Sequence, residues 1–130
     1  DLPNISIFKS QIEKLKEFLV KATPSEAQSK DIDFLLTLGE LFTLVAYGQL
    51  VIENSLIYKV DNDVVDRIFD FMVRDFSKFA LQLYSKPGST SAQMELCLGM
   101  IKKPALDEER FKRVWEKYVY PLKGAYQMNE

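Results

Sequence analysis

Residues 63–85, DVVDRIFDFMVRDFSKFALQLYS, carry apolar side chains that recur with the period of an α-helix. The recurring positions are Val65, Ile68, Phe69, Met72, Phe76, Phe79 and Leu83. Intervals of three and four residues place such side chains on one helical face. Asp61 and Asn62 supply capping side chains before this pattern, and Pro87 removes a backbone donor after it. We therefore predict an amphipathic core helix that ends near Ser85.

The rest of the chain shows the same period. We expect further helices at about 5–21, 24–59, 91–100 and 107–120. Thr23-Pro24-Ser25-Glu26 predicts a capping box at the start of the second of these, with an irregularity near Lys30. No segment alternates apolar and polar residues long enough to predict a strand. The predicted fold class is all-α, an up-and-down helical bundle of about four to five helices that forms a single domain over residues 1–130.

The composition excludes several classes of protein. The 130 residues are 47% hydrophobic and 28% charged, as in ordinary globular domains, and the net charge of −2 does not favour a nucleic-acid partner. Cys97 is the only cysteine, so an internal disulfide is excluded and a cytoplasmic location is expected. The longest apolar region, residues 41–57, contains several polar residues, so we predict no transmembrane segment. The N-terminus lacks the pattern of a signal peptide.

The chain contains no histidine. Most zinc sites, Ser–His and Cys–His catalysis, and the di-iron sites of helical bundles require histidine. The sequence also has no glycine-rich phosphate loop and no nucleophile elbow. We therefore predict no catalytic, cofactor-binding or metal-binding residue in this chain.

Acidic residues near the start of the 63–85 helix are the first candidate site. They are Asp61, Asp63, Asp66 and Asp70. Their carboxylates could bind a hard cation if several oxygens converged on one point. Arg67 and Arg74 follow Asp63 and Asp70 at intervals of four residues. The favoured interpretation is therefore a helix start matched to the helix dipole, with local Asp63–Arg67 and Asp70–Arg74 ion pairs.

Two further candidates have a structural explanation that we favour. Glu40 and Glu53 lie in an apolar helix, where burial would raise the pKa of a carboxyl group. They are separated by about 20 Å along that helix, so they cannot form a catalytic carboxylate pair, and we expect them to be exposed or paired with a cation. Cys97 lies between Leu96 and Leu98 and has no histidine to activate it, which predicts a buried, inert thiol.

The last third of the chain is enriched in positive charge. The basic residues are Lys102, Lys103, Arg110, Lys112, Arg113 and Lys117. They could meet an acidic partner or a phosphate-bearing ligand. Asp107, Glu108, Glu109 and Glu116 are interleaved with them, so a solvated face of mixed charge is favoured. The predicted core stripe of this last helix is Phe111, Val114, Trp115, Tyr118 and Leu122.

The 24–59 segment has more apolar residues than one core face requires. One side carries Ile32, Leu35, Leu38, Leu41, Phe42, Val45 and Ile52, and the other Leu36, Leu44, Tyr47, Leu50, Val51 and Ile57. Phe71 and Val64 likewise lie off the stripe that holds Phe69, Phe76 and Phe79. A helix that is apolar on two sides is central in a bundle or covered by a partner. We expect a contact with something outside this chain.

Three runs of residues resemble a known family. They are GELFTLVAYGQLVIEN at 39–54, VDRIFDFMVRDF at 65–76 and LYSKP at 83–87. These runs resemble the C-terminal helical extension of bacterial acyl-CoA dehydrogenases of the very-long-chain type. The resemblance covers nearly the whole chain and rests on helix-core residues. It implies a parent enzyme of fatty acid β-oxidation that binds FAD and oxidises acyl-CoA thioesters, with its catalytic and flavin-binding residues upstream of this domain.

Three functions follow as hypotheses. The first is an accessory domain, inactive alone and without a cofactor, whose partner is the upstream catalytic body of a flavoenzyme. The chain begins at Asp1 and not at Met, which favours a C-terminal fragment of a larger protein. The second is a free-standing helical interaction module, as a monomer or a homodimer. The third is an acyl-chain-binding bundle with a cavity between the 24–59 and 63–85 helices.

Overall fold

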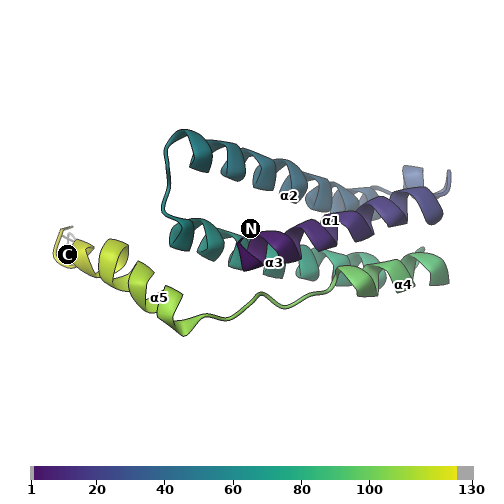
Figure 1. The fold of residues 1–130 in the computed structure, drawn as a ribbon. Helices are drawn as coiled ribbons and strands as arrows, with labels where there is room; N and C mark the ends of the chain where they lie inside the picture. The colour runs from purple at the N-terminus through teal and green to yellow at the C-terminus, as the bar shows by residue number, and fades with distance from the viewer. Residues whose placement is uncertain (1, 126–130) are drawn as a thin grey trace, which may run out of the picture.

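The computed structural model describes residues 2–125, which contain five α-helices and no strand. The α-helices are α1 (Pro3–Lys21), α2 (Ile32–Ile57), α3 (Asn62–Tyr84), α4 (Ser91–Met100) and α5 (Glu108–Val114). Helices α1 to α4 run up and down beside one another, and an extended segment leads from α4 to α5 at the other end of the bundle (Figure 1). The predicted all-α helical bundle is confirmed.

The second helix starts later than predicted. Asp31 is its N-cap, and the Asp31 carboxylate accepts a hydrogen bond of 3.2 Å from the backbone N–H of Phe34. The Thr23 hydroxyl instead donates to the carbonyl of Leu19 at 2.8 Å. Thr23 therefore satisfies a free carbonyl at the end of α1, and it does not cap α2, because α2 begins only at Ile32. The predicted capping box at Thr23 was wrong.

Two glutamines close this end of the bundle. Gln28 lies in the 3-10 turn Gln28–Lys30, and Gln93 lies in α4. Their side-chain amides exchange two hydrogen bonds, at 2.7 and 2.9 Å. Gln93 also completes a capping box with Thr90, which confirms the predicted start of α4. Because both amides are buried, each needs these partners to offset the loss of water.

The hydrophobic core is centred on α3. Phe69, Val73, Phe76 and Leu83 are fully buried on it, whereas Ile68 and Phe79 of the predicted stripe are only half-buried. Phe8 of α1 meets Phe69 and Phe76 edge to face, with ring centroids 5.3 and 5.7 Å apart. This geometry is favoured by the aromatic quadrupoles. The predicted core face of α3 is therefore correct in its main positions.

A glycine brings α2 close to this core. A Cβ added at Gly48 would lie 2.6 Å from Cε1 of Phe8. Any larger residue would push against a buried ring at this crossing. Glycine thus permits the close approach of α1 to α2 at this position.

The C-terminal helix is less integrated than predicted. After Val114 the helix continues as a π-helical turn, Trp115–Val119, and a 3-10 turn, Tyr120–Leu122. Arg110 is the only buried residue between Glu108 and Leu122. The predicted core stripe was wrong for this helix, because the helix meets α3 mainly through Arg110 and its charged neighbours; Phe111 and Trp115 remain about half exposed. The predicted loose tail, residues 128–130, lies outside the described residues.

Candidate functional site

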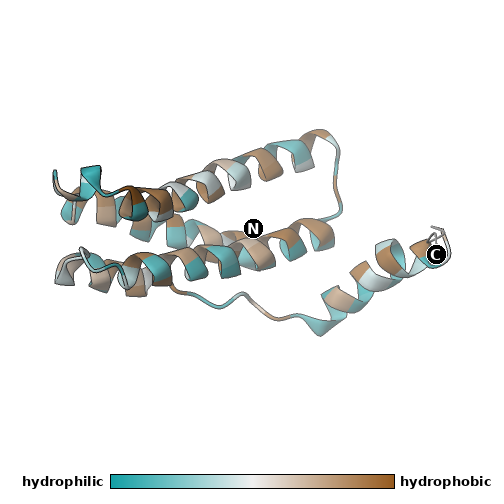
Figure 2. Cartoon of the chain, turned by 180° about the vertical axis from the view of Figure 1, so that it is seen from behind, coloured by the Kyte–Doolittle hydropathy of each residue, from teal (hydrophilic) through white to brown (hydrophobic). Residues whose placement is uncertain are grey.

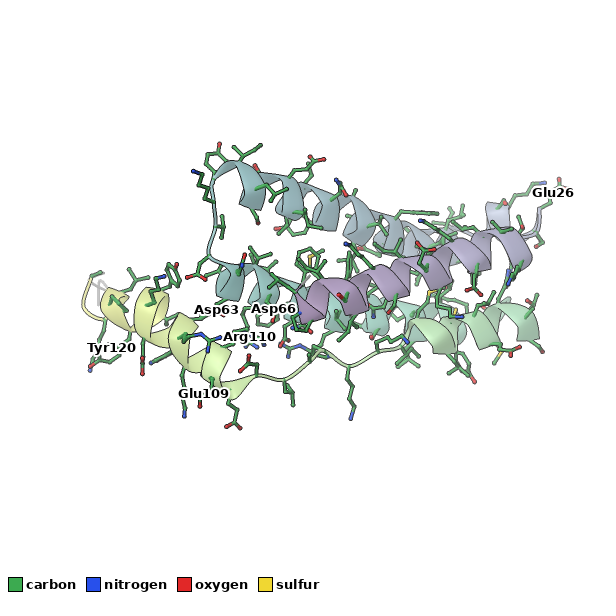
Figure 3. All side chains as sticks on the ribbon, in the orientation of Figure 1. Glu26, Asp63, Asp66, Glu109, Arg110 and Tyr120 are labelled. Atoms are coloured by element: carbon green, nitrogen blue, oxygen red, sulfur yellow. The ribbon has the colours of Figure 1, made fainter. Side chains whose placement is uncertain are left out.

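Arg110 joins α5 to two buried carboxylates of α3. Its guanidinium donates one hydrogen bond to Oδ2 of Asp66 and another, of 3.2 Å, to Oδ2 of Asp70. All three side chains are almost completely inaccessible to water. In Figure 3 Arg110 extends from α5 toward Asp66, whereas Glu109 projects from the opposite side of α5. The acidic group that the sequence singled out thus receives its main cation from a distant segment.

Asn4 extends this network to the start of α1. The backbone N–H of Asn4 donates to Oδ1 of Asp66 at 3.0 Å, and its side-chain amide donates to Oδ2 at 3.3 Å. The Asn4 side-chain oxygen accepts a hydrogen bond of 2.7 Å from the backbone N–H of Ala105. The Asp66 carboxylate therefore connects α1, α3 and α5, and Asn4 connects the start of α1 to the segment that leads to α5.

Asp70 also pairs with the two arginines of its own helix. Nη2 of Arg74 lies 2.6 Å from Oδ1 of Asp70, a close ion pair that lacks hydrogen-bond geometry. Arg67 reaches Oδ2 of Asp70 at 3.2 Å. The predicted Asp70–Arg74 pair is confirmed. The predicted Asp63–Arg67 pair was wrong, because Arg67 turns toward the buried Asp70.

Asp61 and Asp63 pair with the exposed side of the C-terminal helix. Asp63 accepts two hydrogen bonds from Arg113, at 2.7 and 2.9 Å, which hold its pKa below the usual range. The Asp61 carboxylate accepts a hydrogen bond of 2.8 Å from Lys117 and one of 3.0 Å from the Tyr118 hydroxyl. The Lys117 bond, together with the bond from the Asp63 backbone, lowers the pKa of Asp61 to about 2.

These contacts decide between the two interpretations of the acidic group. Each of the four carboxylates is paired with arginine or lysine, and most of these cations come from the C-terminal helix. Within residues 2–125 no group of acidic or sulfur ligands is arranged to bind a metal ion. Ion pairs occupy the acidic group, as the favoured interpretation expected, but only Asp70–Arg74 is one of the two predicted local pairs, and most of the others join α3 to the C-terminal helix.

The sequence contained an unused signal for this network. Asp66 and Asp70 lie four residues apart and next to the core positions Val65 and Phe69. Carboxylates that border a core face are rarely buried without a cation. That position predicts a buried partner such as Arg110, which we had assigned to a solvated face. The other basic residues of this region, Lys102, Lys103, Lys112, Arg113 and Lys117, are exposed as expected.

The other candidate residues offer no activated group. Burial raises the pKa of Cys97 to about 11, so its thiol stays protonated at neutral pH and is a poor nucleophile. Glu40 and Glu53 are both exposed on α2, as predicted. Phe71 is half exposed and lies between Arg67 and Arg74, whose guanidinium carbons are 4.7 and 4.5 Å from the ring centroid. Val64 is partly buried.

The outer face of α2 carries more exposed large apolar side chains than any other helix in residues 2–125. Its exposed side chains are Ile32, Leu35, Leu36, Phe42, Tyr47, Leu50, Leu56 and Ile57. Figure 2 shows apolar residues along the whole length of this helix. The inner face packs against α3 and Phe8 of α1, with Phe34 and Leu41 fully buried. The predicted two-sided apolar character of this segment is present, and one of its sides has no partner within the described chain.

By length and composition, α2 is also the one helix in residues 2–125 that could cross a membrane. Soluble core helices pass the same criterion. The inner face of α2 packs against α3, so the length and composition of this helix are only weak support for a membrane span. The expectation of no transmembrane segment stays a prediction.

A cleft opens where α2 and α3 diverge near their connection. Its volume is about 490 Å³, and it is open to solvent. The lining is mainly apolar and includes Leu2, which precedes α1, Ile5 of α1, Ile52 and Leu56 of α2, and Val65 of α3. A cleft of this lining suits an apolar ligand or an apolar side chain of a partner.

Comparison of the chain with protein families, with characterised proteins and with solved structures gave no match.

Proposed function

We propose that this chain is the C-terminal accessory domain of an FAD-dependent acyl-CoA dehydrogenase. In this role it contributes packing or assembly, and the catalytic body upstream supplies the flavin and the catalytic residues. The observation that supports this role best is the outer face of α2. Ile32, Leu36 and Ile57 are 72%, 66% and 70% exposed on a helix that lies within a folded bundle. Apolar surface of this extent on one helix is typical of a face that another protein surface covers.

The first experiment compares the whole gene product with this chain. We expect the whole protein to bind flavin and to oxidise palmitoyl-CoA in the presence of an electron acceptor. The separate chain should be colourless, inactive and helical by circular dichroism. A gene that encodes only these residues, or a whole protein that neither binds flavin nor oxidises acyl-CoA, would overturn the proposal.

A matched pair of variants tests the packing role. Leu50 on α2 and Leu98 on α4 are both 55% exposed, and α4 packs on α1 and α3. Leu50→Glu should leave the separate chain folded but make the junction with the catalytic body more sensitive to limited proteolysis. Leu98→Glu should leave the proteolysis rate unchanged. Equal rates for both variants would show that the outer face of α2 has no packing role.

An acyl-chain-binding bundle is the second candidate, and the cleft between α1, α2 and α3 favours it. In that case lipid should co-purify with the chain and be detected by mass spectrometry after extraction. Ile52→Glu should remove it, because Ile52 lines the cleft. Extracts of the unaltered chain that contain no lipid would reject this function. A free-standing interaction module is the remaining alternative, and it requires a gene that encodes this domain alone.

A further inference from the structure

The outer face of α2 contains a regular seam. Eight positions recur at alternating intervals of four and three residues. They are Ile32, Leu36, Gly39, Thr43, Ala46, Leu50, Glu53 and Ile57. Each is exposed or half-exposed. We refer to these eight positions as the α2 seam. Such a spacing keeps one line of side chains facing a single neighbouring helix over several turns.

The centre of the α2 seam is shaped for close contact. A Cβ added at Gly39 would meet nothing within 4 Å, so packing inside this chain does not require glycine there. Glycine nevertheless costs about 1 kcal/mol relative to alanine in the interior of a helix. The Thr43 hydroxyl donates to the carbonyl of Gly39 at 2.9 Å, and its polar group is therefore satisfied within the helix. A shallow groove of about 340 Å³ runs over Ile32, Leu36, Gly39 and Thr43.

The charge on α2 has one sign. Between Ile32 and Ile57 the helix carries Asp33, Glu40 and Glu53 and no lysine or arginine. Asp33 pairs with Lys86 at 2.7 Å. Within residues 2–125 neither Glu40 nor Glu53 forms a salt bridge, and the only hydrogen bond to the Glu53 side chain comes from Gln49, at 3.0 Å. Glu53 lies in the seam, and Glu40 lies beside it next to Gly39.

This charge pattern disfavours a second copy of the chain as the occupant. In an antiparallel pair centred between Thr43 and Ala46, Glu53 of one copy would face Leu36 of the other. In a parallel pair, Glu53 would face Glu53. Either arrangement buries a carboxylate without a cation, which is strongly destabilising.

We propose that the α2 seam docks one helix whose contact face is apolar and whose lysine or arginine residues lie opposite Glu40 and Glu53. This helix would bring the missing cations and would cover the exposed apolar residues of α2. The inference rests on the proposed function only in taking this helix from the catalytic body. The chemistry of the contact follows from the seam alone.

Binding of two designed peptides to the 130-residue chain tests the proposal. Both peptides are helices of about 28 residues with the same leucine and alanine seam, and they differ in carrying lysine or glutamate beside it. By fluorescence anisotropy the lysine peptide should bind at least about tenfold more tightly than the glutamate peptide. The Glu40→Lys/Glu53→Lys variant should reverse this preference. Leu50→Glu should abolish binding, and Leu98→Glu should not affect it.

Three outcomes would overturn the proposal. The first is equal binding of both peptides, or a preference that the charge-reversal variant does not change. The second is dimerisation of the chain in sedimentation experiments that Leu50→Glu abolishes, which would assign the seam to a second copy. The third is adsorption to phosphatidylcholine vesicles that Leu50→Glu abolishes, which would assign it to a lipid surface.

The peptide assay needs neither flavin nor acyl-CoA. A lysine preference combined with a flavin-free gene product would therefore retain the seam and reject the proposed function. If the parent protein binds flavin but the separate domain binds both peptides equally, the proposed function would be retained and the seam proposal rejected.

Discussion

Arg110 is the residue on which the buried contact of α5 depends. It lies 3% exposed between Asp66 and Asp70, and no other residue from Glu108 to Leu122 is buried. Transferring three charges out of water is costly, and the cost is recovered only while the ion pairs persist. Its Nε atom has no hydrogen-bond partner, so the network is not fully satisfied even when formed.

Replacing Arg110 should therefore destabilise the fold far more than replacing its exposed neighbour. We expect Arg110→Ala to lower the free energy of unfolding by about 3 kcal/mol, because two buried carboxylates lose a cation. Arg113→Ala removes an ion pair on the surface and should destabilise the fold far less, because solvent screens that pair. Urea denaturation of both variants measures the difference. Similar losses would mean that Asp66 and Asp70 are solvated in the folded chain.

Replacing the two glycines of α2 by alanine should have opposite effects on stability. Gly39→Ala should raise the free energy of unfolding by about 0.5–1 kcal/mol, because the new methyl group meets open space and alanine favours the helix. Gly48→Ala should lower it by about 1 kcal/mol, because the methyl group is forced against the ring of Phe8 and overpacking exceeds the gain in propensity. Thermal unfolding of the two variants tests this. A stabilised Gly48→Ala variant would show that Phe8 moves aside without cost.

At the scale of elements, some of the structure was predictable and some was not. The main core positions of α3 follow from the spacing of its apolar residues, because that face packs against α1 and α2 at once. The start of α2 did not follow. Thr23 and Asp31 are both good N-cap residues, and only the three-dimensional path of the chain determines which of them caps it. Local sequence cannot rank two acceptable caps when the end of the preceding helix uses one of them.

For the last helix, the sequence predicted the wrong face as the one that packs against the bundle. Its aromatic stripe has helical spacing, and such a stripe is usually buried. In the structure the adjacent charged edge, with Arg110, Arg113 and Lys117, makes the main contacts with α3 and its N-cap Asp61. Charge pairing between distant segments leaves no periodic signal in a single sequence. The Arg110 site could therefore be inferred only from the position of Asp66 and Asp70 beside core residues.

The outer part of this contact should depend on pH. The pKa of Asp61 lies at about 2, below the ordinary value of 3.8, mainly because Lys117 donates to the carboxylate. A lowered pKa means that the contact stabilises the folded chain above pH 3.8 and is lost as pH falls toward 2. Trp115, the only tryptophan, lies two residues from Lys117 and reports on this helix by fluorescence.

In the unaltered chain the Trp115 signal should change between pH 3.8 and about 2. In Asp61→Asn, which retains a capping side chain, the change in this interval should be smaller, because the titrating group is gone. The same transition in both proteins would assign it to another carboxylate.

At the scale of the whole molecule, burial is unevenly distributed. Every buried apolar side chain in residues 2–125 belongs to α1, α2, α3 or α4. The C-terminal helix adds ion pairs but little apolar burial, and α2 has apolar area on a second side. Free energy from apolar burial scales with the area removed from water, so most of it resides in the four-helix part. The molecule therefore combines a cooperative core with a peripheral helix and an uncovered face.

Amide hydrogen exchange should separate these two parts. Amides of Phe69–Phe76 on α3 lie in the core and should exchange only through global unfolding. Amides of Phe111–Val114 lie on a helix held mainly by charged side chains, and they should exchange at least about a hundredfold faster, through opening of α5 alone. Because added salt screens the exposed Arg113 and Lys117 contacts, it should accelerate exchange in α5 and leave α3 unchanged. Exchange of both segments at one rate would mean that the buried Arg110 cluster couples α5 to the core strongly enough to make the chain a single cooperative unit.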